Sequence, residues 1–383
     1  MSEKAKKKSA KNLQAALPGD KKVTILGAGK IGFAIAVLLQ AAGGYELRMA
    51  DQSKAALKAV AALGVQTLHI GKGGDLAAAM QDQFAVLNAL PFHMAIDVAG
   101  LAAQLGVHYF DLTEDVQATH TIRKLADKAK SVLMPQCGLA PGFIGIVGND
   151  LAQRFDQLED LKMRVGALPR YPQGTLRYNL TWSTEGLINE YINPCEALVD
   201  GEALTVHALE GLETLALDGI EYEAFNTSGG LGTLTETWAG KARNVDYKSI
   251  RYPGHCAILK LLLNELKLRD QRELLHQIFD SAIPATRQDV IVVFASATGR
   301  KNGRLLQESY SARIVGTTVA GHALTAIQLT TAAGICCALD LVAGKALPQA
   351  GFIGQENIKF DDFLANRFGQ YYRVQDLNAA LAA

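Results

Sequence analysis

The sequence lacks an excess of charge of either sign. Its 383 residues include 38 Lys and Arg and 38 Asp and Glu, which gives a formal net charge of zero. Proteins that bind nucleic acid or a membrane surface by electrostatic attraction usually carry an excess of positive charge. We therefore expect the partner to be a small molecule, and neither a nucleic acid nor a membrane.

Paired cysteines and metal-binding motifs are also missing. The five cysteines are Cys137, Cys195, Cys256, Cys336 and Cys337. They are scattered, odd in number and show no Cys-x-x-Cys spacing, so neither a disulfide framework nor a zinc site is indicated. We expect no metal, and a cytoplasmic protein that keeps its thiols reduced.

No targeting segment is evident. Residues 1–20 are rich in lysine but contain no apolar core, which argues against a secretory signal and predicts a disordered basic tail. The uncharged run over residues 323–339 is just long enough to span a membrane. Because it is dominated by Ala, Thr and Gly and contains Gln328, we interpret it as a buried core helix.

The length predicts two domains, since domains usually contain roughly 100–200 residues. Over residues 21–141, short apolar strands alternate with helical stretches such as "FAIAVLLQAAG" and "ATHTIRKLADKAK". This alternation is typical of βαβ units in a doubly wound parallel sheet, the Rossmann arrangement.

The pattern changes over residues 142–321, for which we predict a second, α+β domain. In "LKMRVGAL", residues Leu161, Met163 and Val165 alternate with Lys162 and Arg164, as in a strand with one solvated face. We therefore expect a largely antiparallel or mixed sheet. The stretches "ILKLLLNELKL" and "QRELLHQIF" are predicted to be helices that cover it.

A glycine motif at the start of the first domain predicts a dinucleotide site. The motif "GAGKIG" covers Gly27, Ala28, Gly29, Lys30, Ile31 and Gly32, between a predicted strand and a predicted helix. Such a loop lets the helix N-terminus approach a pyrophosphate. Asp51 ends the next strand, where an acid hydrogen-bonds the adenosine ribose and repels the 2′-phosphate of NADP. We expect NAD; Arg48 and Lys54 lie close enough to keep NADP as an alternative.

Polar and turn residues end three later strands of the same sheet. They include Asn88 and Pro91, then Asp111, and finally Cys137. Ligands bind outside the carboxyl ends of such strands, so we expect Asn88, Pro91 and Cys137 beside the cofactor. Cys137 has no obvious base, and we interpret it as a packing residue and not as a nucleophile.

Among the acids at the end of this strand and just after it, Asp111 is the better candidate for a catalytic residue. Glu114 is a candidate for contact with the substrate. Thr113 and Asp115 precede a predicted helix, and their pattern fits capping.

The second domain offers further candidates in "LRYNLTWSTEGLINEYINPC" and "YKSIRYPGHC". We expect Trp182, Arg251 and Tyr252 to bind substrate, because an arginine can grip a carboxylate in a bidentate manner. A histidine with a pKa near neutrality can transfer protons, which makes His255 a candidate catalytic residue. A surface arginine and a hydrogen-bonded loop histidine remain the plainer alternatives.

Taken together, these motifs resemble the saccharopine dehydrogenase-like family of NAD(P)-dependent oxidoreductases. The supporting stretches are "ILGAGKIG", "NALPF", "YFDLTED", "CGLAPGF", "TWSTEGLINEYINPCEALVDG", "AFNTSGGLGTLTETWAGK" and "SIRYPGH". Within the family, they are most similar to the lysine 6-dehydrogenases. The resemblance implies that residues 322–383 complete the Rossmann domain and that residues 142–321 form an inserted substrate-binding and dimerisation domain.

The resemblance also implies a reaction. We expect NAD-dependent oxidative deamination of an amino acid, with L-lysine favoured and 2-aminoadipate 6-semialdehyde, NADH and ammonia as products. Since the lysine ammonium must first lose a proton, Asp111 is assigned as base or as partner of its charge, and His255 as the group that handles water. Two alternatives stay open: a saccharopine- or carboxyspermidine-type dehydrogenase that forms C–N bonds reductively, and a non-catalytic nucleotide sensor. A homo-oligomer is expected.

Overall fold

The computed structural model describes residues 21–71 and 74–373. The predicted basic tail, residues 1–20, therefore lies outside the described residues. The chain divides into two compact units. Among the described residues, unit 1 comprises those up to residue 143 together with 318–324 and 328–373, and unit 2 comprises 144–317 and 325–327.

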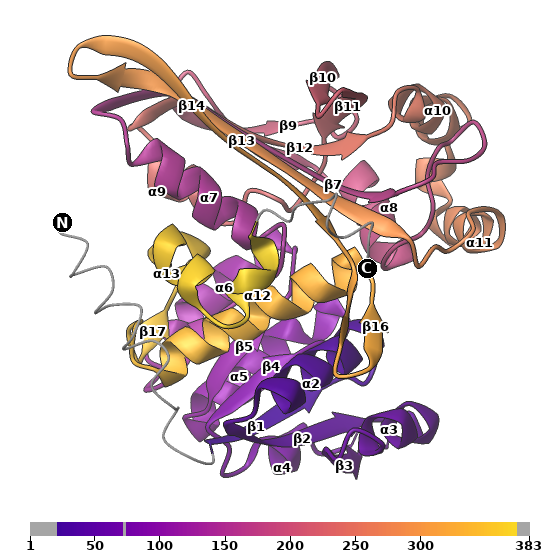
Figure 1. Ribbon diagram of the computed structural model, residues 1–383, viewed down its shortest axis with the longest axis vertical. Coiled ribbons are helices and arrows are strands. Elements are labelled where there is room, and N and C mark those ends of the chain that lie inside the picture. The colour runs from indigo at the N-terminus through magenta and orange to yellow at the C-terminus, as the bar shows by residue number, and fades with distance from the viewer. Residues whose placement is uncertain (1–20, 72–73, 374–383) are drawn as a thin grey trace. The chain divides into compact units, whose positions relative to one another are not determined.

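Unit 1 is built on a seven-stranded sheet in which all neighbouring strands are parallel (Figure 1). Across the sheet lie β17 (Gly351–Phe352), β6 (Val132–Met134), β5 (His108–Asp111), β4 (Ala85–Asn88), β1 (Lys21–Leu26), β2 (Tyr45–Asp51) and β3 (Gln66–His69). The strand order reverses between β1 and β4, which is the point where doubly wound sheets bind dinucleotides. The predicted Rossmann fold is confirmed.

The connecting helices begin where the sequence provides capping side chains. They are α2 (Lys30–Ala42), α3 (Lys54–Ala61), α4 (Leu76–Met80), α5 (Ala95–Leu105) and α6 (Val116–Ala126). Ser53, Asp75 and Asp115 each accept a hydrogen bond from a backbone N–H in the first turn of α3, α4 and α6. Such bonds satisfy donors that a helix start leaves unpaired. The capping role predicted for Asp115 is therefore confirmed.

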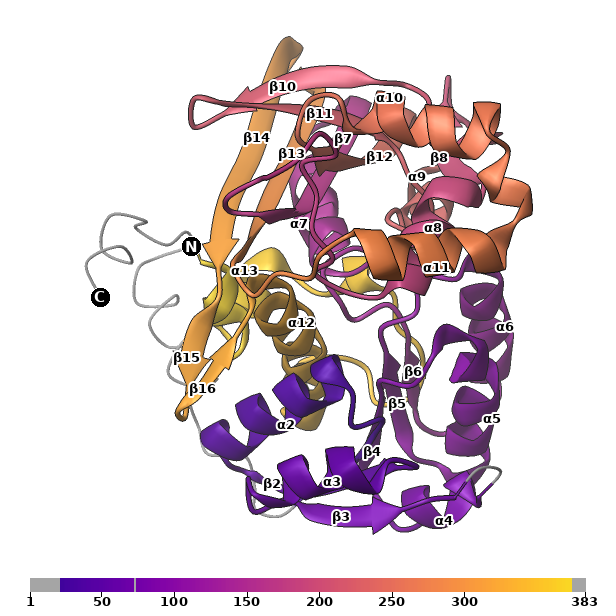
Figure 2. The same ribbon diagram turned by 90° about the vertical axis from the view of Figure 1, so that its right-hand side faces the viewer.

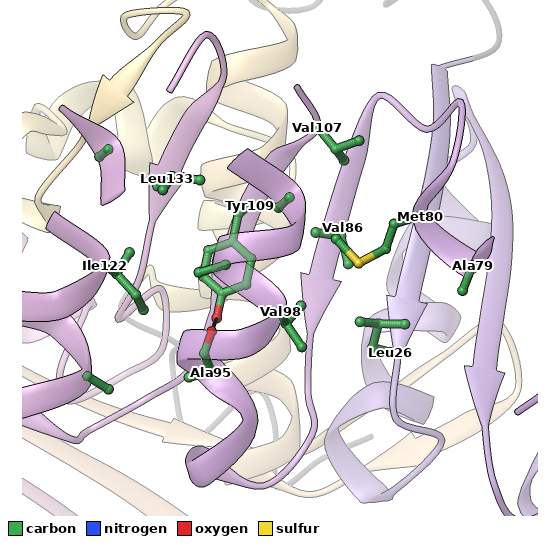
Figure 3. Packing of buried hydrophobic residues seen from close by; sticks show 14 of the residues in the cluster. Leu26, Ala79, Met80, Val86, Ala95, Val98, Val107, Tyr109, Ile122 and Leu133 are labelled. Carbon is green, nitrogen blue, oxygen red and sulfur yellow. Dashed lines mark hydrogen bonds between the residues drawn. The ribbon is translucent and has the colours of Figure 1, made fainter. Parts of the chain in front are cut away.

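Helices α4, α5 and α6 contribute to an apolar core on one face of this sheet (Figure 3). Val98 on α5 and Ile122 on α6 are fully buried, as are Leu26 on β1 and Leu133 on β6. Burial of apolar surface of this kind is the main favourable term in folding. It fixes the strands whose carboxyl ends carry the candidate site.

The last part of unit 1 comes from the end of the chain. Helix α12 (Ala326–Ala343) is the one described helix long and apolar enough to cross a membrane, yet 83% of it is buried inside the protein, as expected of a core helix. It is followed by η4 (Gln355–Asn357), α13 (Phe360–Ala365) and η5 (Gly369–Tyr372). Arg367 ties this segment down, because it donates to the carboxylate of Asp340 and to the carbonyl oxygens of Ala42 and Gly43.

Unit 2 contains an eight-stranded mixed sheet. Its main path is β10 (Glu213–Leu217), β11 (Ile220–Asn226), β12 (Ala242–Arg251), β7 (Gln157–Pro169), β13 (Asp289–Lys301) and β14 (Arg304–Val315), with β8 (Cys195–Val199) and β9 (Glu202–Val206) branching from β12. The pair β7 and β12 is parallel, whereas the other pairs are antiparallel. A separate two-stranded piece, which apart from Thr317 belongs to unit 1, joins β15 (Thr317–Val319) and β16 (His322–Leu324).

Arg164 corrects the prediction of a solvated face on β7. Leu161, Met163 and Val165 are buried as expected, but the Arg164 side chain is also only 1% exposed. It donates to the carboxylates of Glu213 and Asp246, which come from β10 and β12. A buried guanidinium needs such partners, and the alternating pattern along β7 did not reveal them.

The helices of unit 2 are α7 (Phe143–Ala152), α8 (Thr184–Ile192), α9 (Leu234–Trp238), α10 (His255–Lys260) and α11 (Arg272–Ala282). Helices α8, α10 and α11 pack together around one apolar cluster that includes Leu187, Leu259 and Phe279 (Figure 2). The stretch "ILKLLLNELKL" is not one continuous α-helix. After α10 it continues as a π-helical turn, η2 (Leu261–Glu265), and a 3-10 turn, η3 (Leu268–Asp270).

Candidate active site

The glycine loop of unit 1 has the geometry of a dinucleotide cradle. Gly27 has a φ of +97°, and a Cβ there would lie 2.7 Å from the carbonyl oxygen of Ala89. A Cβ on Gly32 would lie 1.8 Å from the carbonyl oxygen of Gly27. Both positions therefore require glycine, the first for the turn and the second for close packing of α2.

The middle glycine of the loop, Gly29, faces open space. No atom lies within 4 Å of a Cβ placed on Gly29, and both Gly29 and Lys30 are exposed, whereas Ala28 is buried and Ile31 half-buried. Gly29 also immediately precedes α2, whose first N–H groups and positive dipole end favour an anion. The residues present fit a pyrophosphate at this loop.

Asp51 lies at the end of β2 and is fixed against the same loop. One carboxylate oxygen accepts a hydrogen bond from Ala28 N at 2.6 Å, and the other accepts one from Ser53 N at 2.6 Å. The Arg48 side chain donates to the side-chain oxygen of Gln66 on β3 at 3.3 Å. A carboxylate is therefore held beside the loop, while the nearby arginine donates to a neutral amide and keeps its charge.

Asp111 is buried within a hydrogen-bonded network at the ends of β5 and β6. Its Oδ1 accepts from Thr113 N at 3.0 Å and Gln136 N at 2.9 Å, and its Oδ2 accepts from the Tyr109 hydroxyl at 2.6 Å. Burial raises the pKa of Asp111 to about 6, although these hydrogen bonds act to lower it. The geometry fits a carboxylate that positions the strand ends, and its role as a base stays a prediction.

The other expected cofactor neighbours differ in exposure. Asn88 is buried, with its Oδ1 accepting from Leu90 N and its Nδ2 donating to the Tyr109 hydroxyl, whereas Pro91 is exposed. Cys137 is buried, and burial raises the pKa of its thiol well above the usual range. That environment favours packing over nucleophilic attack.

The turn that follows Cys137 is fixed by backbone contacts. Gly142 has a φ of +138°, and a Cβ there would lie 2.0 Å from the carbonyl oxygen of Gly138. Gln355 Nε2 from the end of the chain donates to the carbonyl oxygen of Pro135 at 3.0 Å and lies 3.4 Å from the Cys137 sulfur. The segment is therefore a rigid part of unit 1.

Arg251 is the centre of a buried polar cluster in unit 2. It donates to Glu190 Oε2, to the Tyr191 hydroxyl and to the carbonyl oxygen of Ile250, each at 2.9 Å. Its guanidinium also lies over the ring of Tyr178, 5.1 Å from the centroid. Burial opposes its charge, but the neighbouring Tyr191, Tyr178 and Glu190 hold the pKa of Arg251 above its usual value. The arginine is therefore a permanent cation beside a carboxylate.

His255 belongs to the same cluster, but its environment differs from the one we predicted. Its Nδ1 lies 3.0 Å from the carbonyl oxygen of Leu176, so this nitrogen carries the hydrogen, and its Nε2 then accepts from the Tyr191 hydroxyl at 3.0 Å. Burial, together with the charge of Arg251, lowers the pKa of His255 to about 3. The expected pKa near neutrality is wrong, and a catalytic role for the ring stays a prediction.

The remaining predicted substrate residues lie in three different settings. The Tyr252 hydroxyl donates to the carbonyl oxygen of Pro169 at 2.9 Å, so this group already has a partner. Trp182 is half-buried and packs over Gly186 at the start of α8, where a Cβ would lie 2.3 Å from the indole ring. Glu114 is a half-buried residue of unit 1.

Three residues of unit 2 that the sequence analysis missed shape this cluster. Glu190 and Tyr191 supply the partners of Arg251, and both lie inside the family motif "TWSTEGLINEYINPC". Glu223 accepts from Gly254 N at 2.8 Å and Cys256 N at 2.6 Å, which fixes the turn before α10. Glu223 carries no local signal, since it pairs with a segment more than thirty residues away.

Within residues 21–71 and 74–373, no group of three or more His, Cys, Asp and Glu side chains could hold a metal ion.

Comparison with known proteins gives two family models that together cover most of the chain. The model described as the saccharopine dehydrogenase NADP binding domain matches residues 23–134. The model described as the saccharopine dehydrogenase C-terminal domain matches residues 138–368.

One solved structure shows the same fold, and two others align with lower TM-scores. Saccharopine dehydrogenase (L-Glu forming) from Saccharomyces cerevisiae aligns with a TM-score of 0.69 at 14% identity, covering 89% of this chain and 95% of that one. An engineered D-amino acid dehydrogenase bound to NADP+ aligns with a TM-score of 0.47 at 12% identity, covering 95% and 99% of the two chains. The C. glutamicum DAP dehydrogenase in complex with DAP gives 0.45 at 12%, covering 94% and 98%.

Proposed function

Because this chain belongs to the saccharopine dehydrogenase family of NAD(P)-dependent oxidoreductases, we propose that it oxidises L-lysine at the ε-carbon, with NAD as the acceptor. Lysine, NAD+ and water would give 2-aminoadipate 6-semialdehyde, ammonium, NADH and a proton. The cofactor, when bound, supplies the acceptor for the hydride. The protein must bind the dinucleotide, hold the amino acid and accept the ammonium proton.

Asp51 supports NAD over NADP. Its carboxylate is held by Ala28 N and Ser53 N at the end of β2, where the adenosine ribose of a dinucleotide lies in this fold. The negative charge would repel a 2′-phosphate, although the Arg48 side chain, which donates through Nε to the neutral amide of Gln66, keeps its positive charge on the neighbouring part of β2. The free ribose hydroxyls of NAD would find a hydrogen-bond acceptor in the Asp51 carboxylate.

The Arg251–Glu190 pair is the single observation that carries the choice of substrate. The α-amino-acid end of lysine has one carboxylate and one ammonium, and this buried pair offers one cation and one carboxylate. Arg251 donates three hydrogen bonds to protein acceptors and has further N–H groups that a ligand carboxylate could use, although its side chain is only 3% exposed. The side chain of Glu190 is 14% exposed and can accept from an ammonium.

Three cations of unit 2 are already paired with carboxylates, which counts against saccharopine, because its three carboxylates would need several cations. Among the other cations of unit 2, Arg164 and Lys248 are neutralised by Glu213 and Asp246. Arg243 is largely exposed and pairs with Asp200. A substrate with one carboxylate fits this arrangement better.

The test follows NADH absorbance with purified enzyme, NAD or NADP, and a panel of amino acids and amines. We expect NADH from lysine, little from 1,5-diaminopentane, which lacks the carboxylate, and a slower reaction with NADP. Activity only in the reductive direction, with a keto acid and an amine, would replace the proposal with a saccharopine-type reaction. Cofactor binding without turnover on any substrate of the panel would favour a nucleotide sensor.

A further inference from the structure

Glu223 is a buried acid of β11 whose carboxylate binds the backbone of a neighbouring segment. It lies directly opposite Arg251 of β12 in the antiparallel register, so the two side chains are on the same face of the sheet. One carboxylate oxygen accepts from Gly254 N at 2.8 Å, and the other accepts from Cys256 N at 2.6 Å. Both oxygens are therefore engaged with the turn that leads from Arg251 into α10.

This contact replaces a cap that α10 lacks. The residue before α10 is Gly254, which has a φ of +96° and no side chain that could accept from the first turn of the helix. In many helices a side chain of this residue satisfies one of the N–H groups there. Here the acceptor is Glu223, more than thirty residues earlier in the chain. Glu223 therefore fixes the backbone on both sides of His255, the first residue of α10.

His255 in turn fixes the direction of one hydroxyl hydrogen. Its Nδ1–H donates to the carbonyl oxygen of Leu176 at 3.0 Å, so its Nε2 accepts from the Tyr191 hydroxyl at 3.0 Å. Because that hydroxyl has a single hydrogen, its oxygen is left to accept from Arg251 Nε at 2.9 Å. A histidine ring that turned over or changed tautomer would leave the hydroxyl hydrogen without this acceptor. The position of the ring therefore matters for the setting of the arginine.

We propose that Glu223 is a positioning residue for the substrate site of unit 2. By holding the turn before α10, its carboxylate keeps the cluster around Arg251 in the arrangement that meets the α-amino-acid end of the substrate. The inference rests on the proposed function, and it gives Glu223 no contact with the substrate itself. Loss of the carboxylate should weaken binding of the amino acid and leave the dinucleotide site of unit 1 unchanged.

The first test is Glu223→Gln, which has nearly the same size but offers one acceptor oxygen where the wild type offers two. Its NH2 group would face a backbone N–H. We expect the KM for lysine to rise about tenfold, with kcat and the KM for NAD changed by less than about twofold, because a contact that serves ground state and transition state equally affects KM alone. An unchanged KM for lysine, or an equal rise in the KM for NAD, overturns the proposal.

Glu223→Asp is the second variant, for the case that Glu223→Gln does not fold. It keeps the charge, but its side chain is one methylene shorter and cannot reach both backbone N–H groups as the glutamate does. We expect a smaller rise in the KM for lysine, again without a change in the KM for NAD. A folded Glu223→Asp variant with the wild-type KM for lysine overturns the proposal.

Asp289→Asn is the matched control. Asp289 on β13 is also buried, and its two carboxylate oxygens accept from Ala326 N at 2.6 Å and Ile327 N at 2.9 Å at the start of α12. The substitution removes the same kind of contact from a different helix. We expect a lower melting temperature and an unchanged KM for lysine. An equal rise of this KM in Asp289→Asn and Glu223→Gln overturns a specific role for Glu223.

The second test does not depend on the substrate. Long-range 1H–15N NMR spectra of histidine-labelled protein at pH 7 distinguish the two neutral tautomers, and the His255 signal is the one that His255→Asn removes. We expect the Nδ1–H tautomer alone in the wild type and in Asp289→Asn, and a mixture of tautomers in Glu223→Gln. A wild-type spectrum in Glu223→Gln overturns the positioning role. If the spectrum changes as expected but the wild type does not oxidise lysine, the proposed function fails and the positioning of His255 is supported.

Discussion

Asp111 shows how strongly one residue's surroundings restrict its chemistry. Three donors, Thr113 N, Gln136 N and the Tyr109 hydroxyl, already hold its carboxylate. In an Asp111→Asn variant, the side-chain oxygen could still accept from Thr113 N and Gln136 N, and the side-chain NH2 could donate to the Tyr109 hydroxyl. The Tyr109 hydroxyl could then donate to the carbonyl oxygen of Ala95, which lies 3.1 Å away. Asp111→Asn is therefore a substitution that removes the charge and keeps the fold.

We expect Asp111→Asn to lower kcat by about 100-fold or more, the range typical of general acid–base catalysis, with the Kd for NADH unchanged. Steady-state kinetics and fluorescence titration of NADH measure the two quantities. In the wild type, kcat should fall as the pH drops through about 6, because the carboxylate then takes up its proton. Turnover near the wild-type value would leave Asp111 with the positioning role alone.

Asp51 determines the choice of dinucleotide in our proposal. Replacing it with asparagine removes the charge that faces the 2′-position and keeps a side chain of the same size. We expect the ratio of kcat/KM for NADP to that for NAD to rise about tenfold, which corresponds to about 1.4 kcal/mol. Initial rates with each cofactor give the ratio. An unchanged ratio would mean that other residues discriminate between the two cofactors.

His255 links the buried cluster of unit 2 to pH. The unfolded chain protonates this ring below its ordinary pKa of 6.5, whereas the folded protein keeps it neutral down to about 3. Stability should therefore decrease as the pH falls below 6.5, by about 2 kcal/mol at pH 5 from this residue. His255→Asn should remove that part of the pH dependence. Urea unfolding at pH 7 and pH 5 measures the free energy of unfolding at each pH. An equal loss of stability between the two pH values in wild type and variant would contradict the assignment.

At the scale of elements, the charged cluster across β7, β10 and β12 holds distant strands together. Arg164 lies between Glu213 and Asp246, and Lys248 donates to Glu213 at 2.8 Å. Arg164→Met would leave two carboxylates short of a partner, so we expect the free energy of unfolding to fall by about 2–4 kcal/mol. Chemical denaturation measures the loss.

The matched control is Arg243→Met. Arg243 also pairs with an acid on a neighbouring segment, Asp200, but both side chains are mostly exposed, at 61% and 71%. Exposed ion pairs contribute little, so we expect no measurable change in the unfolding midpoint. If Arg164→Met and Arg243→Met lower the free energy of unfolding by the same amount, burial does not explain the effect at Arg164.

These elements also show which parts of the structure the sequence can predict. The glycine loop, the capping residue Asp115 and the Rossmann sheet depend on residues close together in sequence, and short patterns report them reliably. The burial of Arg164 depends on Glu213 and Asp246, which follow 49 and 82 residues later. The low pKa of His255 likewise depends on groups from other elements. Periodicity along one strand or loop contains no information about such partners.

At the scale of the whole molecule, cofactor binding should stabilise one unit directly. The glycine loop, Asp51 and Asp111 all belong to unit 1. A ligand that binds only the folded protein raises its stability by mass action, by about 2.7 kcal/mol at a concentration 100 times the Kd. We expect NAD to raise the melting temperature more than NADP at equal concentration. Differential scanning calorimetry measures both shifts, and equal shifts would contradict the preference for NAD.

The order of segments along the chain has a consequence for synthesis. Unit 1 is interrupted: its sheet starts with β1 at Lys21, yet its edge strand β17 begins at Gly351, after the whole of unit 2. A ribosome therefore delivers every strand of unit 2 before α12, β17 and Arg367 have left the exit tunnel. Until then the nascent first unit has an uncovered β6 edge and lacks the contact of Arg367 with Ala42 and Gly43. A chain that terminates between β14 and β17 would therefore contain all strands of unit 2 but an incomplete nucleotide-binding unit.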